Sequence, residues 1–147
     1  GPLPRCSADR KDQIVSRIFH QSAVIPFRYC EGLLQVLLIT SSDGRRWVVP
    51  KGMLEPGMGP AESAAKEAIE EAGVRGRVSE SSVGTYAYRK WGGTIKVEVF
   101  LLEVQEELND WPEAQARRRE WLTVEQAVQR VAAPGLGVLL ERVPRLV

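Results

Sequence analysis

Three glutamates gather in the short stretch KEAIEEAG: Glu67, Glu70 and Glu71. Spacings of three and four residues place side chains on one face of a helix, where like charges repel by roughly 0.2–0.5 kcal/mol per pair. Carboxylate oxygens are also the ligands that Mg²⁺ prefers, and Mg²⁺ commonly keeps waters and substrate phosphates as further ligands. A cation beside a spare carboxylate can activate water for attack on phosphorus. The trio therefore predicts metal-assisted phosphate chemistry, with a solvated acidic helix face as the alternative.

A helix over residues 60–72 must position these glutamates. Pro60 suits the first helical turn, Glu62 suits the positive N-terminal end, and Gly73 suits the position just past the helix. Another stripe of the helix is made of alanines, which allow close packing against a sheet: Ala61, Ala64, Ala65, Ala68 and Ala72. The preceding residues 51–59 include three glycines and one proline. This composition predicts a loop whose backbone can approach a phosphate chain or offer a carbonyl to a metal.

The remaining sequence alternates between strand and helix patterns. Strands are predicted at residues 22–28, 33–40, 46–49, 77–87 and 94–105, and helices at 123–132 and 138–142. Glu31 and Gly32 are the predicted turn of a hairpin between the first two strands. This order of elements predicts an α/β domain, with helices packed on a mixed sheet. Residues 1–20 are predicted to be an N-terminal tail or edge segment, and residues 21–147 a single domain.

Composition limits the classes of partner. A chain of 147 residues can form one domain without disulfides or a structural metal. The formal net charge of +1 gives no overall field that selects nucleic acid or an anionic membrane. The two cysteines, Cys6 and Cys30, belong to no metal-ligand pattern, and no apolar stretch is long enough to span a bilayer. We therefore expect a cytoplasmic protein with a small-molecule partner, no nucleic acid and no membrane; the oligomeric state is not readable.

The stretch GMLEPGMGPAESAAKEAIEEAGV, residues 52–74, resembles the Nudix box, G-x5-E-x7-R-E-U-x-E-E-x-G-U, in which U is a bulky apolar residue. Six positions match in register: Gly52, Glu67, Glu70, Glu71, Gly73 and Val74. The flanking stretches RWVVPKG (46–52) and DWPEAQARRREW (110–121) resemble diphosphoinositol polyphosphate phosphohydrolases and their bacterial relatives. The resemblance implies a Nudix-type mixed β-sheet sandwiched between α-helices, within a single Nudix hydrolase domain.

Two positions depart from the box. Met58 stands where the family has its first glutamate, and Lys66 stands where the family has arginine. In the family these two residues are understood to pair and so to link the loop to the helix. Here we expect Lys66 to pair with Glu62 one helical turn back and Met58 to pack. The metal carboxylates would remain.

The resemblance also implies roles for individual residues. Glu67 and Glu71 would bind the metal together with the carbonyl of Gly52 or Lys51, and Glu70 would be the base that activates water. The implied cofactor is Mg²⁺, with Mn²⁺ as a substitute. Substrates of the subgroup are dense in phosphate, so cationic and hydroxyl side chains should surround the site. The candidates are Arg28, Ser41, Ser42, Arg45, Arg46, Lys51, Arg89, Lys90, Arg117 and Arg118.

Three functions fit these residues. The first is a Mg²⁺-dependent hydrolase that cleaves a phosphoanhydride bond in a diphosphoinositol polyphosphate or a dinucleoside polyphosphate. The second is a nucleoside triphosphate pyrophosphohydrolase that cleans the nucleotide pool, which would need an aromatic pocket that reads the base. The third is a non-catalytic Nudix module that binds a nucleotide or a partner. The complete trio of glutamates argues against the third.

Overall fold

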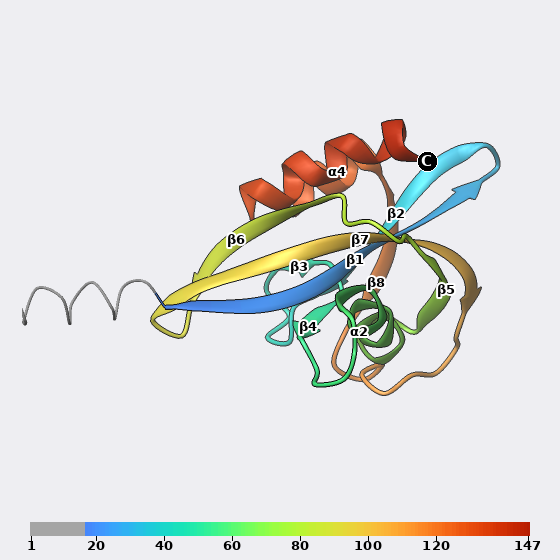
Figure 1. Cartoon of the computed structure of the whole chain (residues 1–147). Helices are drawn as coiled ribbons and strands as arrows, with labels where there is room; N and C mark the ends of the chain where they lie inside the picture. Colours follow the sequence, from blue (N-terminus) through green and yellow to red (C-terminus); the bar gives the residue numbers. More distant parts are fainter. Residues whose placement is uncertain (1–16) are drawn as a thin grey trace, which may run out of the picture.

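An eight-stranded mixed sheet forms the centre of the protein. The computed structural model describes residues 17–147, so the first sixteen residues of the predicted tail, with Cys6, lie outside the described residues. The elements are β1(Ile18–Cys30), β2(Leu33–Thr40), β3(Trp47–Val48), β4(Lys51–Met53), α2(Pro60–Glu67), the π-helical turn η1(Ala68–Ala72), β5(Val74–Val78), β6(Gly84–Lys90), β7(Gly93–Glu107), β8(Arg119–Thr123), α3(Val124–Arg130) and α4(Pro134–Leu146) (Figure 1).

The two longest strands, β1 and β7, lie side by side in parallel and organise the sheet (Figure 1). β1 also pairs antiparallel with β2 and with the short β4, while β7 pairs antiparallel with β5 and β6. Strands β3 and β8 both pair with β2. The pairing of β1 with β7 begins at Ile18, which lies opposite Thr94. Because this pair is parallel and the other pairs are antiparallel, the sheet is mixed, as the order of predicted elements indicates.

Helices cover both faces of this sheet. Ala23 and Ile25 of β1 point into a core that includes residues of α3 and α4, whereas Val24 points into a second core beneath α2. This alternation follows from the pleat of a strand, in which successive side chains point to opposite faces. Figure 1 shows α4 on one side of the sheet and α2 on the other. The predicted α/β sandwich is confirmed.

Several local predictions are confirmed. The hairpin between β1 and β2 turns through Glu31 and Gly32, whose φ angles are 51° and 81°. Thr123 caps α3, since its hydroxyl accepts a hydrogen bond from the Gln126 backbone while the Gln126 side chain accepts one from the Thr123 backbone. No helix within residues 17–147 combines the length and the apolar character needed to cross a membrane.

Other boundaries differ from the prediction. The single strand predicted at residues 77–87 is wrong, because residues 79–83 separate β5 from β6 and the two strands pair with different parts of β7. The sequence pattern also misses β8, whose residues REWLT alternate poorly, and α4 extends well beyond the predicted residues 138–142. Pairing with distant parts of the chain determines the strand boundaries, whereas α4 begins with Pro134 in its first turn.

The alanine stripe of the glutamate helix lies directly on the sheet. Ala64, Ala68 and Ala72 are fully buried against β1 and β7, in the same core as Val24 and Phe100. Small side chains allow the helix axis to lie close to the strands, and this closeness places the helix next to the edge where β4 pairs with β1. The predicted stripe is confirmed for these three alanines and for the partly buried Ala61, which packs against the same core, whereas Ala65 does not belong to that core.

Replacing Ala68 with leucine tests this close packing. Extra methylenes in a filled core cost about 1–3 kcal/mol, so Ala68→Leu should lower the free energy of unfolding by about that amount in urea denaturation. Ala116→Leu, at an exposed position, is the control and should change stability by less than about 0.5 kcal/mol. Equal stability of the two variants would show that the helix does not lie close against the sheet.

Candidate active site

The helix that carries the glutamates changes geometry at its end. Its first two turns are α-helical, with Gly59 as N-cap and Pro60 in the first turn, but residues 68–72 form a π-helical turn. Such turns are frequent at functional sites. Gly73 ends the helix with a φ of 65°, a left-handed conformation that favours glycine. The predicted bounds are confirmed, and the π-helical turn is a feature that the sequence pattern did not indicate.

Two of the three glutamates lie together, Glu71 buried and Glu67 half-buried. The Glu67 carboxyl is close enough to Glu71 for a hydrogen bond between the side chains, and Glu71 is only 7% exposed. Burial, reinforced by the neighbouring Glu71 carboxyl, raises the pKa of Glu67 to about 8. Burial also raises the pKa of Glu71, although the Arg117 guanidinium opposes this rise. A carboxyl pair with one buried and one half-buried member is stabilised in its ionised form by nearby positive charge.

The third glutamate points elsewhere. Glu70 Oε1 lies 3.8 Å from Lys66 Nζ, and the Glu70 side chain is partly exposed. Within residues 17–147, no three His, Cys, Asp or Glu side chains are grouped closely enough to surround a metal ion. The convergence expected from helical spacing is therefore present for Glu67 and Glu71, whereas Glu70 turns to the neighbouring cation.

Gly52 lies in β4, at the start of the stretch 51–59 that is predicted to be a loop, and allows the glutamate pair to approach this strand. A Cβ atom at position 52 would lie 2.5 Å from Glu67 Oε1, which is closer than any side chain can tolerate. The adjacent Lys51 backbone N–H donates to Glu71 Oε1 at 3.3 Å. The β4 backbone is thus adjacent to both carboxyls. The carboxylate oxygens of Glu67 and Glu71 and the backbone carbonyls of β4 are the type of ligand that a hard cation such as Mg²⁺ prefers.

Lys66 links the helix to the loop through a different partner from the one predicted. The expected pair with Glu62 is wrong, because Lys66 Nζ donates to both carboxylate oxygens of Glu55 at 2.9 Å. Glu62 is exposed on the first turn, whereas Glu55 lies in the loop beside the helix. Met58 is half-buried. The chain therefore keeps a salt bridge between loop and helix, with the carboxylate supplied by position 55 rather than 58.

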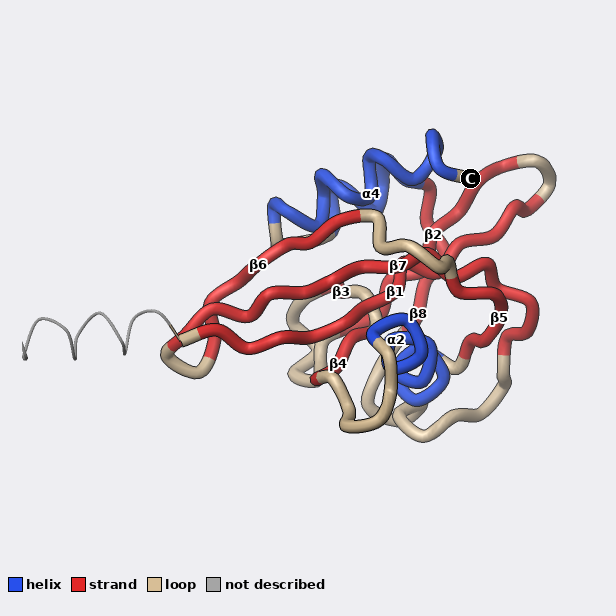
Figure 2. The backbone as a smooth tube through the Cα atoms, in the orientation of Figure 1, coloured by secondary structure: helices blue, strands red, loops and turns tan. Residues whose placement is uncertain are grey.

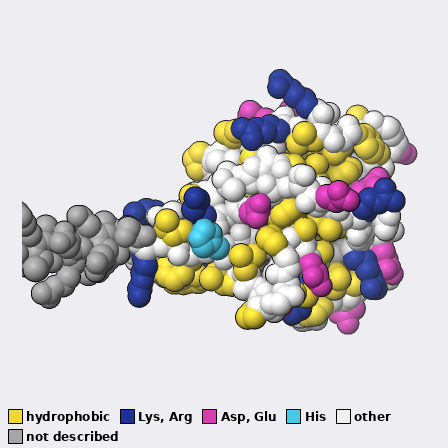
Figure 3. Space-filling view, viewed as in Figure 1, with side chains coloured by type: hydrophobic (Ala, Val, Ile, Leu, Met, Phe, Trp, Pro, Cys, Tyr) yellow, Lys and Arg dark blue, Asp and Glu magenta, His cyan; other side chains and the backbone are white. Residues whose placement is uncertain are grey.

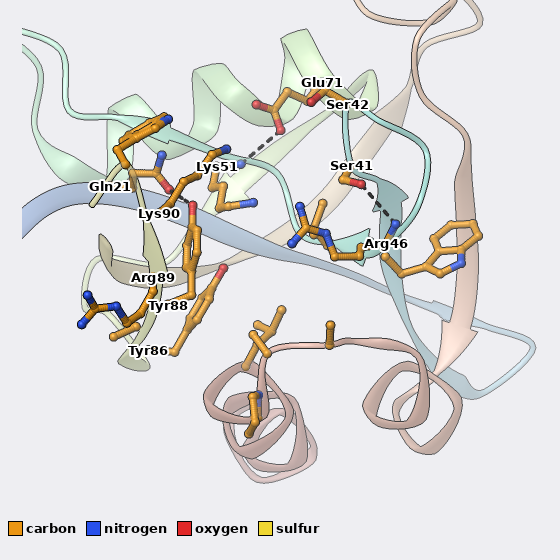
Figure 4. A pocket seen from close by; sticks show the side chains of 18 of the residues that line it. Gln21, Ser41, Ser42, Arg46, Lys51, Glu71, Tyr86, Tyr88, Arg89 and Lys90 are labelled. Carbon is orange, nitrogen blue, oxygen red and sulfur yellow. Dashed lines mark hydrogen bonds between the residues drawn. The ribbon is translucent and has the colours of Figure 1, made fainter. Parts of the chain in front are cut away.

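A pocket of about 610 Å³ opens beside Glu71. Most of the predicted substrate-binding residues line it, namely Ser41, Ser42, Arg46, Lys51, Arg89 and Lys90 (Figure 4). Arg117 also lines it. Five of these residues are cationic, so the pocket is strongly positive apart from Glu71. Lys and Arg side chains also gather at the end of the molecule where β6 turns into β7, and there Arg89 and Lys90 are exposed (Figure 3).

Two polar residues of this pocket, Ser41 and Arg117, are held by contacts of their own. The Ser41 hydroxyl donates to Asp43 at 2.6 Å and accepts a bond from the Arg46 backbone, so it closes the loop that carries Arg46. The Arg117 guanidinium lies 3.7 Å from Glu71 Oε2 and donates to the Thr40 carbonyl at 3.0 Å. Ser41 thus has a structural role, and Arg117 contacts the acidic pair as well as the pocket.

Three candidates from the sequence lie outside the pocket. Arg28 donates to Gln35 at 2.9 Å, and its guanidinium lies 4.2 Å from the centre of the Trp121 ring. Arg118 is exposed and lies over Trp47, while Arg45 is exposed in the loop after β2. Sequence position alone does not reveal on which side of a strand or loop an arginine lies.

Sequence reasoning missed a tyrosine wall. Tyr86 and Tyr88 line the pocket from β6, with ring centres 6.3 Å apart in a stacked arrangement (Figure 4). The Tyr88 hydroxyl donates to Gln21 of β1 at 2.9 Å, and Lys51 Nζ lies 5.7 Å from the Tyr88 ring. The spacing of two residues places both rings on one face of a strand. The prediction misses this signal because the predicted strand ends at residue 87, before Tyr88, whereas β6 continues to Lys90.

Comparison with known proteins agrees with this geometry. The NUDIX domain model matches residues 19–143. The mitochondrial Nudix hydrolase 16 of Arabidopsis thaliana is 38% identical over 128 residues, which cover 75% of this chain and 71% of that protein. Diphosphoinositol polyphosphate phosphohydrolase 3-beta of Bos taurus is 37% identical over 98 residues, which cover 65% of this chain and 58% of that protein. The chain thus spans little more than half of the bovine relative.

Solved structures share the fold at lower identity. An Ap4A hydrolase binary complex from C. elegans superimposes with a TM-score of 0.72 at 22% identity, covering 87% of this chain and 96% of that one. The NUDIX domain of Shewanella oneidensis NrtR, solved with ADP ribose, gives a TM-score of 0.70 at 16% identity and covers 92% of both chains. The matched model spans most of the chain, including the glutamate helix and the pocket. The chain therefore belongs to the Nudix family and is a hydrolase of that family.

Proposed function

We propose that this Nudix hydrolase cleaves a phosphoanhydride bond in a phosphate-dense small molecule, a diphosphoinositol polyphosphate or a dinucleoside polyphosphate, with Mg²⁺ as cofactor. The observation that supports this proposal is an acidic pair, the half-buried Glu67 and the buried Glu71, next to a pocket lined by five cationic side chains. A cation would offset the buried acid, and the arginines and lysines would bind the phosphates. Mn²⁺ could replace Mg²⁺.

The metal would be held by Glu67, Glu71 and the carbonyl of Gly52. Bound there, it would supply Lewis-acid polarisation of the phosphate. Glu70, on the adjacent turn, would accept a proton from the attacking water as the water oxygen bonds to phosphorus and the bridging P–O bond breaks. Glu70 is partly exposed and paired only at 3.8 Å with Lys66, so its carboxylate is accessible to water.

The residues of the pocket favour substrates with several phosphates. Arg46 and Arg117 bring two guanidinium groups, which bind phosphate oxygens in pairs, and Lys51 lies beside Tyr88, with Nζ 5.7 Å from the ring. Tyr88, which is half-buried and stacked on the buried Tyr86, provides aromatic surface against which a nucleobase could pack. An aromatic surface of this kind would suit a substrate that contains a nucleobase. It therefore supports the dinucleoside polyphosphate, and the nucleoside triphosphate as the alternative substrate. The cytoplasmic location stays a prediction.

A substrate panel tests the reaction and the base together. Phosphate release should be measured with and without Mg²⁺ on a diphosphoinositol phosphate, a diadenosine polyphosphate and several nucleoside triphosphates. Glu70→Gln should lower kcat by about 10²–10⁴-fold on the preferred substrate, because the proton acceptor is lost. Glu62→Gln, an exposed glutamate on the same helix, is the control and should retain full activity. Binding of Mg²⁺ without turnover of any substrate would favour the non-catalytic module.

Gly52→Ala tests the close approach of β4 to the Glu67 carboxyl. The new Cβ would collide with the Glu67 carboxyl, so the carboxyl must move away from β4. We expect the Mg²⁺ concentration for half-maximal activity to rise by about 10–100-fold, the range seen when groups that orient metal ligands are lost. Gly59→Ala is the control, because a Cβ at that position meets no atom within 4 Å. An unchanged Mg²⁺ requirement would remove Glu67 from the proposed metal ligands.

The raised pKa of Glu67 predicts an unusual dependence of stability on pH in metal-free protein. Folded protein binds the Glu67 proton up to about pH 8, whereas the unfolded chain releases it near 4.5. The free energy of unfolding therefore falls as pH rises between these values, and Glu67→Gln removes the Glu67 contribution to this fall. In urea denaturation with a chelator, Glu67→Gln should be more stable than wild type at pH 8, with the difference vanishing near pH 4.5. A difference independent of pH would contradict the raised pKa.

A further inference from the structure

The backbone carbonyls at the end of the glutamate helix accept hydrogen bonds from a single later segment of the chain. Four consecutive backbone carbonyls, at positions 70–73, all accept hydrogen bonds from residues 108–119, which we call the capping segment. The pairs, donor first, are Glu113 N to Glu70 O at 3.0 Å, Trp111 Nε1 to Glu71 O at 3.1 Å, Arg119 Nη1 to Ala72 O at 2.9 Å and Leu108 N to Gly73 O at 2.7 Å. Figure 2 shows most of this segment as the loop between β7 and β8.

These contacts address a specific physical problem. The last carbonyls of a helix have no partner within the helix, and together they form the negative end of the helix dipole. Here that negative end belongs to the same turn that carries Glu70 and Glu71, so unpaired carbonyls would add to the negative charge of the carboxylates. The Arg119 guanidinium brings a positive charge to this end.

Trp111 and Arg119 also fit tightly around Gly73. The Arg119 guanidinium carbon lies 4.0 Å from the centre of the Trp111 ring. A Cβ atom on Gly73 would come within 2.6 Å of the Trp111 ring and 2.8 Å of Arg119 Nη1. Arg119 is itself anchored by a 2.6 Å bond from Nη2 to the Leu108 carbonyl, and its side chain is only 17% exposed. Both side chains therefore occupy defined positions against the π-helical turn.

We propose that Trp111 and Arg119 are positioning residues that set the direction of the Glu70 and Glu71 carboxylates by binding the carbonyls of the turn that carries them. This inference rests on the proposed function of the glutamates. Trp111 bonds directly to the backbone of Glu71, so a shift of the indole moves the backbone of a proposed metal ligand. Small displacements of catalytic groups can cost about 10²-fold in rate.

Trp111→Phe and Arg119→Lys are the decisive variants. Phenylalanine keeps an aromatic ring beside Arg119 but lacks the N–H donor, and lysine keeps the charge but lacks the planar fork. The affinity of the full chain for Mn²⁺ alone should be measured by electron paramagnetic resonance, together with kcat and KM on the preferred substrate. We expect each variant to lose about 10-fold or more in Mn²⁺ affinity, with kcat reduced more than KM is raised.

A matched control and a stability measurement separate positioning from a merely structural role. Arg75→Lys changes an exposed arginine that pairs with Glu106 at 2.7 Å, and it should leave Mn²⁺ affinity and kcat unchanged. If Trp111→Phe and Arg119→Lys lower the thermal stability but leave Mn²⁺ affinity and kcat unaltered, the positioning role is overturned. The proposed function would not be affected by that result. A wild-type chain that binds no Mn²⁺ would overturn the proposed function and this inference with it. If Arg119→Lys does not fold, Trp111→Phe decides the question.

Discussion

The crowding of two neighbouring carboxyl groups, the half-buried Glu67 and the buried Glu71, is the constraint on which the rest of the site depends. Burial opposes ionisation and proximity opposes it further, so each surrounding group must tolerate or offset the pair. Gly52 leaves room for one carboxyl, the Lys51 amide donates to the other, and Arg117 supplies positive charge within 4 Å. The fold thus confines the two carboxyl groups beside β4 and places a cationic pocket next to them.

The link between loop and helix shows how a family feature can survive a change of residues. The box lacks its first glutamate, since Met58 occupies that position, and lysine replaces arginine at position 66. The resulting pair of Lys66 with Glu55 has two short contacts and joins the same two elements. An ammonium group can donate hydrogen bonds in several directions, so it can pair with a carboxylate at a neighbouring loop position. The two departures from the box are therefore compatible with an intact loop-to-helix connection.

Local patterns predicted the parts of the fold that local interactions determine. The glutamate helix, the turn at Glu31 and the cap at Thr123 follow from side chains that are close in sequence, and all three are confirmed. The parts that depend on distant pairing were missed, including β8 and the break between β5 and β6. The same reason explains the site: the tyrosine wall and the position of Arg28 depend on which strands become neighbours. The π-helical turn was also beyond prediction, because the later capping segment binds its carbonyls.

The alanine stripe has a consequence for how this enzyme can change over evolution. Alanines at 64, 68 and 72 allow close approach to the sheet, but methyl groups interlock weakly and do little to fix the rotation of the helix about its own axis. The rotational setting must then come from the two ends, through Glu55 in one loop and the capping segment in the other. Substitutions in these surface loops could retune the angle between acid and substrate without any repacking of the core. Divergence in reaction preference among relatives is therefore expected to accumulate at the margins of the helix, where mutation is least costly to folding.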